Sequence, residues 1–183
     1  MDYDKLLKKN RRKPIVSPEM LSGETSFTLL NFGQDQIKKI IPHRDPFLLV
    51  EKLTAVDLSE GEECIVGTRI IPASDPVFQG HFPDFPVYPG SLQLEMGGQL
   101  GLCLTHFFLN KTTEIPADAS PSPVRATKVL GALFLAPLLP EKEVTLIAKK
   151  LEFDGYFGTV LSQVVCEDKV CCVSISEVIF LDD

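Results

Sequence analysis

The sequence predicts an α+β fold in which one long antiparallel β-sheet curls around a single apolar helix. Runs rich in β-branched and apolar residues lie on both sides of residues 90–109, and that segment is apolar on nearly every side. Because every face of such a helix must be covered, we expect the strands to wrap around it. A doubly wound parallel sheet fits poorly, since strands and helices do not alternate along the chain.

The bulk composition is typical of a single globular domain. The chain has 183 residues, of which 44% are hydrophobic and 23% charged, and domains commonly contain about 100–150 residues. No apolar run approaches the roughly 18 residues that span a bilayer, and the N-terminus lacks the pattern of a secretory signal. We therefore expect a cytoplasmic protein, and its net charge of −7 argues against nucleic-acid binding.

Cofactor binding has little support in the sequence. Five cysteines lack the paired short spacings of a zinc site, and we interpret them as reduced packing residues: Cys64, Cys103, Cys166, Cys171 and Cys172. No glycine-rich phosphate loop follows a predicted strand. We expect neither a metal nor another cofactor.

Residues 1–35 are interpreted as an N-terminal extension, and residues 36–183 as one domain. Prolines and a glycine interrupt the extension, leaving room for a short helix near residues 3–9. Its start is strongly basic and contains Lys5, Lys8, Lys9, Arg11, Arg12 and Lys13. From composition we expect a solvated, mobile tail.

The first elements of the domain are a short helix and a hairpin. Residues 35–41 predict a helix that is capped by Asp35 and stops before Pro42. Residues 47–56 and 63–71 predict two strands joined by a charged turn. A proline-rich loop at residues 72–88 then leads into the apolar helix.

Strands follow the apolar helix. A connection rich in Pro, Ser and Asp at residues 115–123 precedes strand-like runs at residues 124–130, 132–135, 143–151, 156–166 and 170–181. The first two runs would form one strand bent at Gly131, since glycine often marks a bulge.

The apolar helix carries two polar residues on one face. Glu95 and Gln99 are four residues apart, so they lie one turn from each other. A carboxylate buried here would have to find donors or take up a proton, and a protonated carboxyl group near neutral pH is a suitable general acid. The alternative is that Glu95 lies on a solvated stripe or anchors a buried hydrogen-bond network.

Three histidines are candidates for a proton-accepting partner. His106 lies 11 residues beyond Glu95 in the same helix, a separation of about 16 Å along the axis. His43 follows the first short helix, and we interpret it mainly as a capping or loop residue. His81 lies in a proline-fixed loop just before the apolar helix, and histidine is the side chain best suited to exchange protons near pH 7.

The start of the apolar helix offers a third polar component. Pro89-Gly90 opens the helix, whose first backbone N–H groups have no internal acceptor and attract negative charge. Glycine at this position would let a ligand carbonyl approach the backbone closely.

Three motifs occur together in this chain: PHRDPFLLV at 42–50, FQGHFPDFPVYPG at 78–90 and LQLEMGGQ at 92–99. In this order they resemble the β-hydroxyacyl-acyl carrier protein dehydratases of fatty-acid synthesis. The resemblance extends from residue 36 to the end of the chain. It implies a hot-dog fold and a homodimer, or a higher oligomer such as a hexamer, in which His81 of one subunit meets Glu95 of the other.

The same resemblance implies a hydro-lyase reaction. A (3R)-hydroxyacyl thioester, carried on the phosphopantetheine of an acyl carrier protein, would lose water to give the trans-2-enoyl thioester. His81 would take the proton next to the carbonyl, Glu95 would protonate the departing hydroxyl or organise the water, and the Gly90 N–H would bind the thioester carbonyl. Gln99 would support Glu95, and the loop and acyl channel would be shaped by Phe82, Pro83 and Tyr88, which would equally suit core packing.

The chain departs from the family pattern in the segment after its third strand. Residues 131–142 lack the basic side chains and the turn glycine that are usual there. Basic charges would ordinarily attract an acidic acyl carrier protein, so the basic N-terminal run would be an alternative contact.

Residues 95–98 carry two further features that bear on function. Gly97 and Gly98 replace the usual alanines, which we attribute to close packing of the helix on the sheet, with a wider pocket as the alternative. At Glu95 the chain is similar to the branch of the family that only dehydrates, whereas the relative that also isomerises the double bond carries aspartate there, so the resemblance favours a dehydratase without isomerase activity.

Two other functions compete with this prediction. A thioesterase on the same fold would use a carboxylate to activate water against the thioester carbonyl. A non-catalytic acyl-binding subunit would keep the pocket without turnover. The spacing of His81, Gly90 and Glu95 favours the dehydratase.

Overall fold

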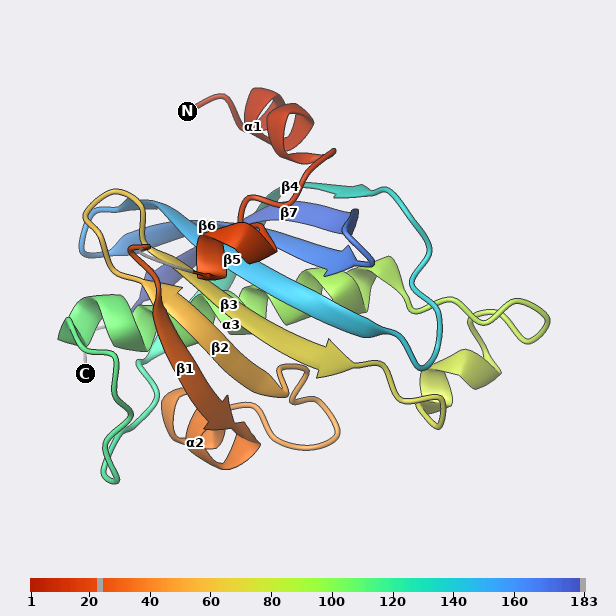
Figure 1. Ribbon diagram of the computed structural model, residues 1–183, viewed down its shortest axis with the longest axis horizontal. Coiled ribbons are helices and arrows are strands. Elements are labelled where there is room, and N and C mark those ends of the chain that lie inside the picture. The colour runs from red at the N-terminus through yellow and green to blue at the C-terminus, as the bar shows by residue number, and fades with distance from the viewer. Residues whose placement is uncertain (23–24, 182–183) are drawn as a thin grey trace.

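The computed structural model describes residues 1–22 and 25–181. It contains one seven-stranded antiparallel sheet in the order β1-β2-β3-β5-β6-β7-β4, with the long helix α3 against its inner face (Figure 1). The predicted arrangement of a long sheet around one apolar helix is confirmed.

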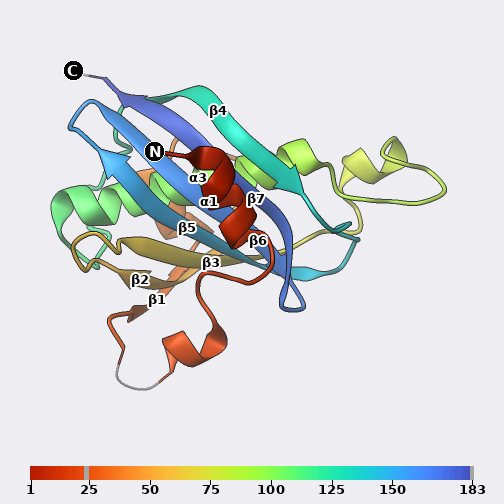
Figure 2. The ribbon, with the colours of Figure 1, turned by 90° about the horizontal axis from the view of Figure 1, so that it is seen from above.

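The N-terminal tail is packed against the outer face of the sheet, so the expectation of a mobile tail is wrong. Helix α1, Tyr3–Asn10, lies across β4 and β7, as Figure 2 shows from above, and a 3-10 helix, η1, follows at Pro18–Leu21. Leu7 and Val16 are buried in a second apolar cluster on this face. Composition alone did not predict the packing of the tail, because the apolar surface that the tail covers belongs to strands far along the chain.

One buried polar residue fixes the tail to the sheet. Gln163 of β6 is completely buried, and its side-chain amide donates to Asn10 O at 2.6 Å and Lys13 O at 3.0 Å. Its carbonyl oxygen accepts from Ile15 N at 2.8 Å. Three hydrogen bonds to the backbone of the tail therefore hold it at a defined place.

The extension also contributes a strand that the sequence did not predict. β1, Thr28–Gly33, pairs with β2 at one edge of the sheet. Leu29 is exposed, and the run lacks the alternation of apolar and polar residues that identifies a half-buried strand. Pairing with β2, rather than local sequence, specifies this element.

Helix α2, Gln34–Ile40, begins directly after β1. Its N-cap residue is Gly33 and not Asp35, because the Gln36 side chain turns back and accepts from Gly33 N at 3.2 Å. Asp35 lies in the first turn, 3.8 Å from Lys38. The predicted helix is confirmed and its predicted cap is wrong.

β2, Lys52–Asp57, and β3, Cys64–Ile70, form the predicted hairpin. The first strand starts later than expected. Residues 47–49 make backbone hydrogen bonds to a side chain of α3 instead of a neighbouring strand.

α3 spans Gly90–Asn110, in agreement with the prediction, and follows a loop that contains the 3-10 helix η2, Pro76–Gln79. The helix contacts β3, β5, β6 and β7. Its sheet-facing side chains are fully or almost fully buried: Met96, Leu100, Cys103, Leu104 and Phe107.

The four remaining strands are β4 (Val124–Phe134), β5 (Glu143–Phe153), β6 (Phe157–Cys166) and β7 (Lys169–Phe180). β4 is one strand, with a shift in register between Val129 and Gly131 as the glycine predicted. In the turn before β5, Glu141 has a φ of 61°. This left-handed conformation favours glycine, so the missing turn glycine leaves a glutamate in a strained position.

All five cysteines are free thiols. Burial raises the pKa of Cys64 and Cys172 to about 12, so these thiols stay protonated at neutral pH. Within residues 1–22 and 25–181, no helix is long and apolar enough to cross a membrane.

Candidate active site

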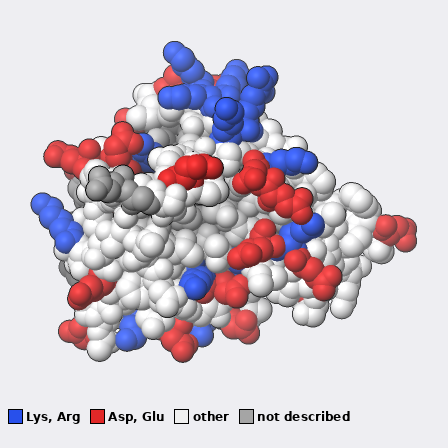
Figure 3. Space-filling model, in the orientation of Figure 1, with Lys and Arg blue, Asp and Glu red and all other residues white. Residues whose placement is uncertain are grey.

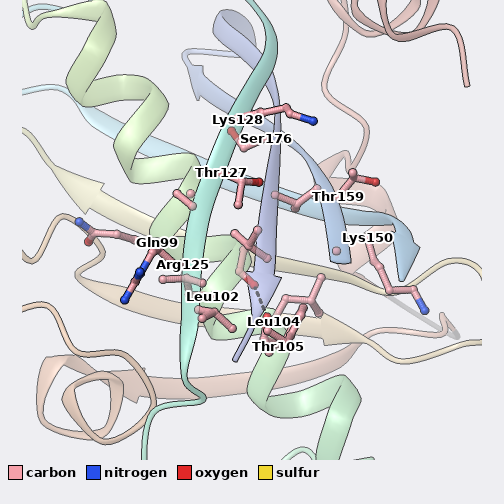
Figure 4. A pocket seen from close by; sticks show the side chains of 18 of the residues that line it. Gln99, Leu102, Leu104, Thr105, Arg125, Thr127, Lys128, Lys150, Thr159 and Ser176 are labelled. Atoms are coloured by element: carbon pink, nitrogen blue, oxygen red, sulfur yellow. Dashed lines mark hydrogen bonds between the residues drawn. The ribbon is translucent and has the colours of Figure 1, made fainter. Parts of the chain in front are cut away.

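A cavity of about 500 Å³ lies between α3 and the strands β4, β5, β6 and β7. In Figure 4, β4 passes in front of it with Arg125 and Thr127, and Gln99 and Leu102 of α3 also line it. The helix lines it from Leu94 to Phe108, a length of about 20 Å at 1.5 Å per residue.

Glu95 lies at the edge of this cavity and is held by two side chains. Its Oε1 accepts from Gln99 Nε2 at 2.9 Å and lies 3.4 Å from His43 Nε2. The Glu95 side chain remains 32% exposed. The Glu95 carboxyl group therefore has a hydrogen-bond donor, which is one of the two outcomes expected from the sequence, and it still faces the cavity.

Gln99 connects the helix to the segment after the PHRDPF motif. Its Nε2 also donates to Phe47 O at 2.8 Å, and its Oε1 accepts from Leu49 N at 2.7 Å. Gln99 is almost completely buried, and each of its polar atoms is used. One amide thus aligns Glu95 and fixes the chain that carries His43.

His43 lies beside Glu95, a contact that the sequence did not predict, since from sequence His43 is interpreted mainly as a capping or loop residue. Burial lowers the pKa of His43, and the nearby Glu95 carboxylate partly opposes that shift. Its Nδ1 is buried and has no hydrogen-bond partner among the described residues. The available signal was its place in the PHRDPF motif, because no local pattern shows that a residue 52 positions earlier would contact Glu95.

His81 is held by contacts within its own loop. Its Nδ1 lies 2.9 Å from Val87 O, and its ring stacks on Phe82 at 4.2 Å. A carbonyl oxygen can only accept, so Nδ1 carries the proton and Nε2 of the neutral ring has a free lone pair. This tautomer suits a general base.

Gly90 begins α3, and its N–H belongs to the turn that has no acceptor within the helix. The ring of Phe134 lies against it, so close that a Cβ at position 90 would come within 2.6 Å of the ring. Glycine is therefore required here for the approach of β4, and the space above the helix start is bounded by an aromatic ring.

The three loop residues predicted to shape the site occupy different environments. Tyr88 is 1% exposed and packs in the main core beside Phe78, with ring centroids 5.9 Å apart. Phe82 and Pro83 are exposed. Of the described residues that line the 500 Å³ cavity, none comes from this loop.

Gly97 and Gly98 serve the two purposes that the sequence left open, one each. A Cβ on Gly97 would lie 2.2 Å from Ser162 Oγ, so this glycine permits close packing on β6. A Cβ on Gly98 would meet no atom within 4 Å, and Gly98 lines the cavity. The second glycine therefore widens the pocket.

The single chain brings together Glu95, Gln99 and His43, but not His81. Among the described residues, no hydrogen bond or ion pair joins His81 to Glu95. Three aromatic side chains beside His81 and Gly90 are more than half exposed: Phe82 (56%), Phe85 (59%) and Phe134 (57%).

The architecture is that of the hot-dog fold. The chain resembles the dehydratase heterocomplex ApeI:P from Xenorhabdus doucetiae with a TM-score of 0.55 and 15% identity, over 80% of this chain and 91% of that one. It also resembles the HP0420 homologue from Helicobacter felis with a TM-score of 0.54 and 11% identity, over 92% of this chain and 98% of that one. These distant likenesses establish the fold.

Sequence similarity places the chain in a family. The family model for the FabA-like domain matches residues 41–172, so the chain belongs to the FabA-like family. It is 31% identical over 139 residues to the 3-hydroxyacyl-[acyl-carrier-protein] dehydratase FabZ of Sulfurovum sp., covering 76% of this chain and 90% of the relative.

Two further relatives bear the same name. Identity to FabZ of Campylobacter jejuni is 41% over 105 residues, which covers 57% of this chain and 67% of the relative. Identity to FabZ of Macrococcus caseolyticus is 50% over 74 residues, and that match spans 40% of this chain and about half of the relative, 48%.

Proposed function

We propose that the protein dehydrates (3R)-hydroxyacyl thioesters, carried on an acyl carrier protein, to trans-2-enoyl thioesters in fatty-acid or related acyl-chain synthesis. The observation that carries this proposal is Glu95, held by Gln99 and His43 at the edge of a 500 Å³ cavity that α3 lines from Leu94 onward. Relatives of the protein are named 3-hydroxyacyl-[acyl-carrier-protein] dehydratases.

His81 and Glu95 divide the proton transfers of the reaction. His81 Nε2 takes the proton from C2, and those electrons form the C2–C3 double bond as the C3–O bond breaks. Glu95 gives its proton to the departing hydroxyl, which leaves as water. A base and an acid are both needed because the C2 proton is weakly acidic and hydroxide is a poor leaving group.

The start of α3 stabilises the charge that develops on the substrate. The Gly90 N–H donates to the thioester carbonyl oxygen while negative charge builds up there. A preorganised donor of this kind contributes about 3–4 kcal/mol to lowering the barrier. His43 and Gln99 act on Glu95, so they are positioning residues.

The site is completed by a second copy of the chain, with His81 of one subunit facing Glu95 of the other. Three features support a dimer: the lack of a hydrogen bond or ion pair between His81 and Glu95 in the described part of one chain, the exposed aromatic side chains beside His81 and Gly90, and the edge position of β4 in the sheet. An unpaired edge strand is a ready surface for another chain.

The direct test is incubation with 3-hydroxybutyryl and crotonyl thioesters, following the absorbance of the conjugated enoyl group and the release of free thiol in parallel. A dehydratase changes the enoyl absorbance without releasing thiol. Release of thiol would identify a thioesterase instead, and absence of both signals would identify an acyl-binding subunit.

A further inference from the structure

Helix α1 presents one apolar and one basic face. Tyr3, Leu6, Leu7 and Asn10 lie toward the sheet, at spacings of three and four residues. The opposite side carries exposed basic residues, which continue just beyond the helix: Lys5, Lys8, Lys9, Arg11, Arg12 and Lys13. Figure 3 shows a dense group of Lys and Arg side chains at the top of the molecule, where Figure 1 places α1.

This basic face is held in a fixed position. Leu7 is buried against Gly131 of β4, and the Tyr3 hydroxyl lies 3.5 Å from Glu152 Oε2. The buried Gln163 binds the backbone at the end of the helix. Binding to a fixed helix costs less conformational entropy than binding to a loose tail, because only the long basic side chains have to be ordered. A fixed position therefore favours binding.

The basic charges are not neutralised within the chain. None of the six side chains forms an ion pair with a described carboxylate, although the protein is acidic. Residues 1–13 contain six basic and two acidic side chains, which leaves twelve basic against 23 acidic elsewhere, a net charge of −11 for the rest. Charge segregation of this size attracts an anionic partner to one face.

One strand, β4, contacts both α1 and the start of α3. Leu7 contacts Gly131 on the outer side of β4, and Phe134, three residues further along that strand, contacts Gly90 on the inner side. Three residues of a strand span about 10 Å. At the Phe134 end of β4 the chain itself is apolar, because residues 132–136 contain no charged side chain.

We infer that the basic face of α1 is the docking surface for the acidic acyl carrier protein, whose thioester-bearing arm then passes around the Phe134 end of β4 to Gly90 and Glu95. This inference rests on the proposed function. A docking surface on α1 accounts for the lack of charge in residues 132–136 near the site. It also accounts for the contacts of Gln163 and Gly131, which fix the basic helix α1 on the sheet. Steered encounter of opposite charges raises the association rate and lowers the dissociation constant.

The test is the Kd for a holo-acyl carrier protein encoded by the same genome, measured with the triple variant Lys5→Gln/Lys8→Gln/Arg12→Gln. We expect its Kd to rise about tenfold, with the salt dependence of binding reduced. The matched control is Lys52→Gln/Lys111→Gln/Lys169→Gln, which removes three exposed basic charges elsewhere on the chain. We expect the control to bind like the wild type.

A small thioester substrate separates this inference from the proposed function. The α1 variant should dehydrate an N-acetylcysteamine thioester at the wild-type rate, because that substrate carries no protein. An unchanged Kd in the α1 variant, or an equal loss in the control, would overturn the docking surface. Loss of binding to phosphatidylglycerol vesicles, with carrier binding intact, would assign the basic face to a membrane surface instead. A wild-type protein that fails on the small thioester refutes the dehydratase, while the Kd still decides the docking surface.

Discussion

Helix α3 has two faces built on different principles. The sheet face is dry and tightly packed, with Met96 and Leu100 fully buried and Gly97 pressed against Ser162. The cavity face is open, with Glu95 partly exposed among mostly apolar side chains and empty space beside Gly98. The two adjacent glycines therefore have different roles, since Gly97 allows close packing and Gly98 makes room for a ligand. Substitutions on the two faces should separate stability from turnover.

The largest effect on turnover is expected on the cavity face, for Glu95→Gln. Loss of the general acid should lower kcat by about 10²–10⁴-fold. The amide still accepts from Gln99, so the free energy of unfolding should change by less than about 1 kcal/mol. Steady-state dehydration and urea unfolding measure the two quantities. A variant that unfolds without losing rate would reverse the roles of the two faces.

On the sheet face, Gly97→Ala should destabilise the protein with little effect on the mechanism. The added methyl group would collide with Ser162, and such overpacking costs about 1–3 kcal/mol. The matched control is Gly98→Ala, which has free space and should gain up to about 1 kcal/mol from helix propensity. Equal free energies of unfolding for the two variants would contradict this account of the pair.

A larger side chain at Gly98 should act on substrate choice. Gly98→Leu fills part of the cavity that follows α3 away from Glu95. We expect kcat/KM for a long acyl thioester to fall at least about tenfold, because one misplaced methylene already changes discrimination by about 1–3 kcal/mol. The four-carbon substrate should be affected less. An equal loss for both substrates would show that the acyl chain lies elsewhere.

The smallest effect is expected on the pH dependence of stability, from the titration of His43. This residue faces Glu95 and has Arg44 beside it. Burial lowers the pKa of His43 in the fold, so the unfolded chain takes up this proton first as the pH falls below about 6.5. Stability should therefore decline from pH 7 downward until the folded pKa is reached. The slope of Tm against pH should be shallower in His43→Asn, and steeper in Glu95→Gln, which lacks the opposing carboxylate.

Parallel curves of Tm against pH for the wild type and His43→Asn would contradict a His43 whose pKa is lowered by partial burial. Dehydration rates across the same pH range provide the second readout. A residue that only fills space would lower the rate by the same factor at every pH, whereas a residue that positions Glu95 should shift the profile.

Sequence reasoning found the parts of the fold that local patterns specify. The apolar helix, the hairpin of β2 and β3 and the four C-terminal strands each carry their own periodicity. It missed β1 and the packing of α1, because both depend on partners far along the chain, such as Gln163 for Asn10. The candidate site likewise has a part that local patterns predict and a part that depends on distant contacts. Glu95 and Gln99 were paired by helical spacing, whereas the contact of His43 with Glu95 arises only when Gln99 binds residues 47–49.

The central claim is that His81 and Glu95 act together across two subunits, and mixing two inactive variants tests it most directly. His81→Ala and Glu95→Gln would be unfolded together in equal amounts and refolded. Half of the resulting dimers are mixed, and each mixed dimer has one intact site, so activity should return to about a quarter of the wild-type value. A mixture that stays inactive, with mixed dimers demonstrated by tagged subunits, would contradict a shared active site.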